Sequence, residues 1–150
     1  SYLFRKSISN MKNPYLNQAN VVKRLLSEWD THGKLIIAYD FDNTVFDYHS
    51  QGHTYDEIIS LLQRCKRIGA YMILFTAAND VRLPFIKEYL GRLGIPCDAI
   101  NENMPGMETT GRKIYYNILL DDRAGLFSAY QALHIACLHM EHQKENDNDK

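Results

Sequence analysis

Residues 34–45 have the sequence KLIIAYDFDNTV, an apolar run followed by two aspartates on either side of a phenylalanine. A short run that is apolar at successive positions is typical of a strand buried on both faces of a parallel sheet. Side chains two residues apart in a strand point the same way. We therefore expect Asp40 and Asp42 to enter one site while Phe41 turns into the core. This stretch predicts a buried strand that delivers paired carboxylates.

Similar apolar runs alternate along the chain with segments whose apolar residues recur at helical spacing. Strands are predicted at residues 34–39, 70–75, 97–101 and 114–120. Helices are predicted at residues 18–29, 55–68, 80–93 and 124–139. Strands that alternate with helices indicate βαβ units with right-handed crossovers. The expected fold class is therefore α/β: a doubly wound, Rossmann-like parallel sheet with helices on both faces.

The remaining segments are predicted from their polar composition. Residues 1–15 look irregular, 47–54 form a loop or small hairpin, and 102–112 form a loop that contains proline and glycine. The tail at 141–150 is polar throughout and is expected to be disordered. The expected domain organisation is a single domain over residues 16–140.

The bulk composition excludes several classes of protein. A formal net charge of -1 provides no overall basic field, so nucleic acid is not indicated as a partner. No apolar run reaches the length of about 18 residues that a membrane-spanning helix needs, and no signal peptide is visible. The three cysteines (Cys65, Cys97 and Cys137) form no C-x-x-C pair. They are expected to be reduced thiols of a cytoplasmic protein.

Polar side chains follow three of the predicted strands at the point where each strand ends. In chain order they are Asp40 and Asp42, then Thr76, then Asp121 and Asp122. Sites in such folds lie beyond the carboxyl ends of the strands, so these side chains are expected to meet there. Each of these three polar clusters alone is common in turns and helix caps. Their occurrence together, each at the end of a predicted strand, favours a functional site. Converging carboxylates need a counter-charge, and Mg²⁺ suits a site of oxygen ligands that also holds phosphate.

The arrangement resembles the haloacid dehalogenase superfamily of phosphotransferases. The first motif of that family, an apolar strand followed by D-x-D-x-[TV]-[LV], is IIAYDFDNTV at 36–45. The second, a strand ending in threonine, is MILFT at 72–76, and the fourth, a strand ending in acids, is ILLDD at 118–122. The third is a lysine before the last strand, for which Lys113 is best placed. The resemblance covers about residues 34–131.

This resemblance implies a chemistry for the paired aspartates. Asp40 is expected to attack phosphorus and to form an aspartyl-phosphate. Asp42 is expected to protonate the leaving oxygen and then to deprotonate the hydrolytic water. Members that cleave carbon–halogen bonds lack the second aspartate, so Asp42 favours phosphate chemistry. The implied activity is Mg²⁺-dependent hydrolysis of phosphate monoesters.

The resemblance also implies ligands for the metal and for the phosphoryl group. Mg²⁺ is expected on the Asp40 carboxylate, the Asp42 backbone carbonyl and Asp121. Asp122 is expected to hold the metal shell in place. The expected phosphate-binding residues are Thr76, Lys113 and Asn43.

Other side chains compete for roles near this site. Lys87 and Arg112 are alternatives to Lys113 as the phosphate-binding cation, and Arg123 is either a surface cation or a substrate contact. Three ring side chains lie in the loop after the first motif: Tyr48, His49 and His53. Substrate contact is one interpretation of the two histidines, and solvated loop positions are the favoured one. Tyr48 could stack on a base or a sugar.

Many members of this superfamily insert a cap domain that selects the substrate, and this chain has no room for one. Residues 46–54 and 101–112 are the segments available, and both are short. Capless members tend to have open sites that accept large substrates or are closed by a partner chain. The expected partner is therefore a phosphorylated small molecule or macromolecule, with a homo-oligomer as one means of closing the site. The ending Asp121–Asp122–Arg123 resembles that of small deoxyribonucleotidases, which hints at a nucleotide.

Two rival functions come from other classes. A receiver-like signalling domain also places acids, a threonine and a lysine on a doubly wound sheet. In such a domain the phosphate-accepting aspartate ends a middle strand and the lysine ends the last one. Here Asn101 ends the third predicted strand and acids end the fourth, so the order is wrong. The other rival is a catalytically idle binding module that kept the fold, which an activity assay would distinguish.

Overall fold

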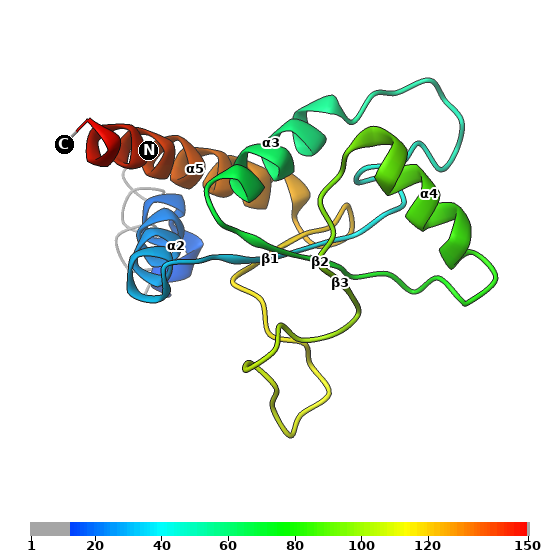
Figure 1. Cartoon of the computed structure of the whole chain (residues 1–150), viewed down its shortest axis with the longest axis horizontal. Coiled ribbons are helices and arrows are strands. Elements are labelled where there is room, and N and C mark those ends of the chain that lie inside the picture. Colours follow the sequence, from blue (N-terminus) through cyan, green and yellow to red (C-terminus); the bar gives the residue numbers. More distant parts are fainter. Residues whose placement is uncertain (1–12, 150) are drawn as a thin grey trace, which may run out of the picture.

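Strand β1 (Ile36–Tyr39) lies inside a parallel sheet and is buried along its whole length. The other strands are β2 (Tyr71–Leu74), β3 (Ala99–Ile100) and β4 (Ile118–Leu120). Their order across the sheet is β3-β2-β1-β4, and all neighbours are parallel. This computed structural model describes residues 13–149 (Figure 1). The predicted α/β fold with a doubly wound parallel sheet is confirmed.

The helices follow the predicted segments with shifted ends. They are η1 (Pro14–Leu16), α2 (Gln18–His32), α3 (Asp56–Arg67), α4 (Leu83–Leu93) and α5 (Leu126–Asn148). Helix α2 begins where the Asn17 side chain accepts a hydrogen bond from the Ala19 amide at 2.9 Å. It ends at Gly33, whose φ of 68° suits a residue without a Cβ atom. The segment predicted to be irregular, residues 1–15, lies outside the described residues as far as residue 12. Pro14 and Tyr15, at its end, belong to the short helix η1.

The two faces of the sheet are covered differently. Alternate strand side chains, such as Ile37 and Leu120, join a core to which all four α-helices contribute. The opposite side chains, such as Ala38 and Ile73, pack against residues of the connection between β3 and β4. Figure 1 shows this connection, residues 101–117, looping away from α3, α4 and α5 on the other side of the strands. The second face is therefore covered by a loop, where we had expected a helix.

Strand β4 is shorter than the strand predicted at residues 114–120. Its register pairs Ile118 with Ile37 and Leu120 with Tyr39. Before it, the Asn117 side chain accepts a hydrogen bond from the Ile36 amide at 2.7 Å and ends the ladder. Residues 114–116 instead pack on the second face of the sheet.

The prediction of a disordered tail at 141–150 is wrong up to Asn148, where helix α5 ends. The Arg64 guanidinium of α3 binds the Glu141 carboxylate at 2.6 Å. The Lys144 ammonium donates a hydrogen bond to the Ile68 carbonyl at 2.8 Å. The polar composition of this segment predicted disorder. A helix that is already formed can be extended at a low cost in free energy, however, and the contacts of Glu141 and Lys144 stabilise the extension.

Candidate active site

The strand order places a crevice between the carboxyl ends of β1 and β4. The chain moves from β1 to β2 and β3 on one side and then returns to β4 on the other, which is the switch point where such sheets bind ligands. The Asp40 amide donates a hydrogen bond to the Leu120 carbonyl at 2.9 Å and ties these two strand ends together. The two acidic segments of the sequence therefore meet at this crevice.

Three carboxylates converge there. Asp40, Asp121 and Asp122 each offer an oxygen, and these oxygens lie within 4.8 Å of one another. The buried Thr44 hydroxyl accepts a hydrogen bond from the Asp122 amide at 3.3 Å, which joins the loop after β1 to the loop after β4. The Asp121 carboxylate accepts one from the Arg123 amide at 2.8 Å. Asp122, expected only to support the metal shell, is close enough to offer a ligand oxygen itself.

Burial makes the charge on Asp40 costly. The pKa of Asp40 is raised to about 6, first by burial and in addition by the neighbouring Asp121 and Asp122 carboxylates. The Phe41 amide acts in the opposite direction by hydrogen bonding. Three oxygen donors with uncompensated charge are a fit for a hard divalent cation such as Mg²⁺.

Asp42 lies apart from this cluster and forms an ion pair. Both of its carboxylate oxygens accept hydrogen bonds from the Arg82 guanidinium, at 2.5 Å each. The guanidinium carbon also lies 5.5 Å from the ring centroids of Phe41 and Tyr48. Phe41 is fully buried, as the alternation along the strand predicted. Asp42 and Asp40 thus face one cleft with different partners.

The segment after β2 brings Thr76 to the same cleft. A side chain from the end of β3 holds it: Asn101 accepts a hydrogen bond from the Thr76 amide at 2.9 Å and donates one to its carbonyl at 2.8 Å. Asn43 also lines the cleft, in a left-handed conformation with φ of 59° that asparagine tolerates. Its amide donates a hydrogen bond to the Phe46 carbonyl at 2.9 Å, which tightens the turn after β1.

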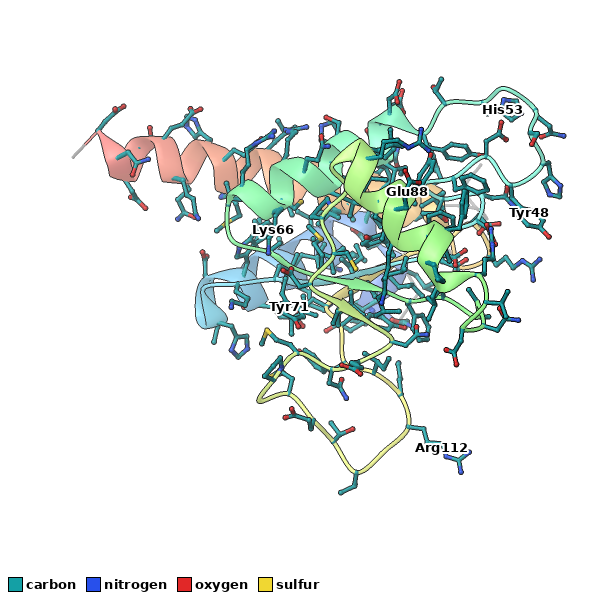
Figure 2. All side chains as sticks on the ribbon, turned by 45° about the vertical axis from the view of Figure 1, so that its right-hand side comes forward. Tyr48, His53, Lys66, Tyr71, Glu88 and Arg112 are labelled. Atoms are coloured by element: carbon teal, nitrogen blue, oxygen red, sulfur yellow. The ribbon has the colours of Figure 1, made fainter. Side chains whose placement is uncertain are left out.

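The cleft has a volume of about 570 Å³ and a mixed lining. Besides the acids it contains Tyr48 and His49, whose ring centroids are 5.1 Å apart. His53 is not part of the lining, and Figure 2 shows it with Tyr48 on the loop between β1 and α3. In the described chain this segment is a loop with one isolated bridge, from Asp42 to Phe46, and no hairpin.

The structure places none of the three predicted phosphate-binding cations in the cleft. The Lys113 ammonium lies 5.7 Å from the ring centroid of Tyr116, on the loop that covers the second face. Arg112 extends from the same loop away from the rest of the molecule (Figure 2). Lys87 lines a separate shallow hollow beside β3. Among the described residues, the cations that line the cleft are Arg82 and Arg123.

Arg82 was missed by sequence reasoning. Proximity along the chain to the last strand favours Lys113 as the candidate cation. Arg82 instead lies shortly after Thr76, in the segment that leaves the sheet at the same edge. Thr76 was selected because it follows the carboxyl end of a strand, where sites in such folds lie. The same reason makes any cation between the end of β2 and the start of α4 a candidate, so the sequence contained a signal for Arg82.

Comparison with known proteins supports the fold. No protein-family model matches this chain, and no curated protein matches it. Among solved structures, a conserved protein coded by a locus of Bacteroides thetaiotaomicron is similar, with 24% sequence identity and a TM-score of 0.51. The match covers 60% of this chain and 77% of that one. At this identity the similarity shows a shared fold.

Proposed function

We propose that this protein is a Mg²⁺-dependent hydrolase of phosphate monoesters. The observation that carries the proposal is the convergence of Asp40, Asp121 and Asp122 at the switch point of the sheet, with Asp42 facing the same cleft. Three converging carboxylates are unfavourable without a cation. Together with an open cleft that can hold a phosphorylated molecule, they favour phosphoryl transfer over a structural role.

The proposed reaction has two steps at one phosphorus atom. In the first, an Asp40 oxygen attacks phosphorus, the bond to the ester oxygen breaks, and Asp42 gives a proton to the leaving oxygen. In the second, water attacks phosphorus and loses a proton to Asp42, and the bond from Asp40 to phosphorus breaks. Inorganic phosphate leaves, and both aspartates return to their initial states.

The chain's own residues hold the reactants. Thr76 and Asn43 line the cleft and are proposed to donate hydrogen bonds to the phosphoryl oxygens. Asp40 and Asp121 would hold Mg²⁺, with Asp122 near enough to contribute and the Asp42 carbonyl retained as a predicted ligand. When bound, the ion would screen the repulsion between the Asp40 carboxylate and the phosphate.

Replacing Asp40 with asparagine tests the nucleophile. We expect the Asp40→Asn variant to lose at least about 10³-fold in kcat/KM on p-nitrophenyl phosphate with Mg²⁺, because an amide cannot form the intermediate. The matched control is Asp30→Asn, an exposed aspartate on α2 outside the cleft. Turnover by Asp40→Asn equal to that of the control would remove Asp40 as the nucleophile.

The receiver-like alternative gains no support from the site. Its phosphate-accepting aspartate would follow a middle strand, which the third strand in chain order would have to provide. Here that strand, β3, lies at the edge of the described sheet and is followed by Asn101, which hydrogen-bonds to Thr76. The idle-module alternative differs from the proposal only in turnover. A wild-type protein that hydrolyses no phosphate ester, while Mg²⁺ still stabilises it, would favour that alternative.

A further inference from the structure

Arg82 is the charged side chain of the cleft to which sequence and family resemblance assign no role. We propose that Arg82 is the phosphate-binding cation of this site, and that it exchanges the Asp42 carboxylate for the phosphoryl group when substrate enters. The inference rests on the proposed function, since it concerns the same cleft and the same reaction.

The geometry of the ion pair shows that Arg82 can bind an oxyanion within the cleft. Its guanidinium already donates two parallel hydrogen bonds to the Asp42 carboxylate. A phosphoryl group presents the same spacing of oxygens with more negative charge, and a guanidinium binds both groups in the same bidentate way. The predicted cation, Lys113, lies instead against Tyr116 outside the cleft.

The same pair blocks the proposed acid step. Asp42 must carry a proton on an oxygen that faces the leaving group, but both of its oxygens accept hydrogen bonds from Arg82. The pair therefore has to open before catalysis. The side chains are 31% and 30% exposed, so water can reach both charged groups when the pair opens.

Aromatic rings would keep Arg82 in the cleft after the pair opens. Its guanidinium carbon lies 5.5 Å from the centroids of Phe41 and Tyr48 and 6.0 Å from that of Phe46. Ring faces attract a cation regardless of its anionic partner. The backbone is also held, because the Asn79 side chain accepts a hydrogen bond from the Arg82 amide at 3.2 Å. Only the end of the side chain has to move.

The first test measures KM for p-nitrophenyl phosphate and the inhibition constant of inorganic phosphate, both with Mg²⁺. We expect Arg82→Ala to raise both constants about tenfold or more, and Arg82→Lys to recover part of the loss as a point charge. Arg92→Ala is the matched control, since Arg92 lies on α4 beside Glu88 and outside the cleft. Its constants should equal those of the wild type.

The second test separates exchange from simple phosphate binding, using calorimetric titration with inorganic phosphate. Asp42→Asn should bind phosphate more tightly than the wild type, because Arg82 is no longer engaged. In an Arg82→Ala background the same change should give a much smaller gain, and this non-additivity is the signature of exchange. An equal gain in both backgrounds means that Asp42 only repels phosphate, and the exchange is then overturned.

The outcomes also separate this inference from the proposed function. If hydrolysis depends on Asp40 but Arg82→Ala leaves both constants unchanged, the role of Arg82 is overturned and the phosphatase proposal stands. If the wild type neither hydrolyses phosphate esters nor binds phosphate, both fail together.

Discussion

At the scale of single residues, the neighbours of each acid determine its behaviour more than its residue type does. Asp40 is half-buried among other carboxylates, and burial together with these neighbours raises its pKa to about 6. Asp42, two positions along the chain, is neutralised by Arg82. One motif thus yields a carboxylate that lies among other carboxylates and another that is paired with a guanidinium. This difference fits the separate roles proposed for them, as nucleophile and as acid.

The raised pKa of Asp40 predicts a pH dependence of stability in the metal-free protein. Between the ordinary value near 3.8 and about 6, the folded state binds more protons at Asp40 than the unfolded state does. Stability therefore falls as pH rises through this window. Asp40→Asn should remove the penalty and be more stable than the wild type at pH 7 by about 1 kcal/mol, a value kept small by solvent screening.

Urea denaturation in EDTA at several pH values between 4 and 7 measures this effect. The difference between the variant and the wild type should grow with pH and shrink again when Mg²⁺ is restored at pH 7. Parallel curves for the two proteins across this range would contradict the raised pKa.

At the scale of elements, contacts between distant segments decide where helices and strands end. The last turns of α5 are ordered beside α3, where Glu141 pairs with Arg64 and Lys144 reaches the Ile68 carbonyl. Strand β4 begins later than predicted, because the Asn117 side chain takes the hydrogen bond of the Ile36 amide before the strand starts. Local composition instead predicted a disordered end for α5 and a longer β4.

The ion pair between α5 and α3 predicts a difference between two similar substitutions. Hydrogen bonding from Arg64 lowers the pKa of Glu141, so the pair favours the folded state at neutral pH. We expect Glu141→Gln to destabilise the protein by about 1 kcal/mol at pH 7, which urea denaturation measures. Glu145→Gln is the control, because the described part of the chain shows no ion pair at Glu145. Identical midpoints for the two variants would contradict a stabilising contribution of this ion pair.

At the scale of the whole molecule, the site is assembled by topology. The return of the chain from β3 to β4 brings Asp121 and Asp122 beside Asp40, although these acids are far apart in sequence. This return passes over the second face as a loop, which carries Lys113 away from the cleft. The fold therefore concentrates negative charge at one edge, where Arg82 pairs with Asp42 and where we propose that Mg²⁺ binds the other acids.

Mg²⁺ is accordingly expected to stabilise the whole fold. Binding to the folded state alone should raise the melting temperature by about 5 °C at saturating concentration. Asp121→Asn should lose most of this shift, whereas Asp30→Asn, outside the cleft, should keep it. Thermal denaturation with EDTA and with millimolar Mg²⁺ measures both. A wild-type melting temperature that does not respond to Mg²⁺ would count against the metal site.

The sequence by itself determined the alternation of strands and helices, the buried first strand, and the acids that follow it. These features depend on local periodicity and on the residues at strand ends, which a linear pattern contains. Only the tertiary structure decided which cation enters the cleft, how far β4 and α5 extend, and what covers the second face. Those outcomes depend on contacts between residues far apart in the chain, such as Arg82 with Asp42 and Arg64 with Glu141. A local sequence pattern does not specify which distant residues come into contact.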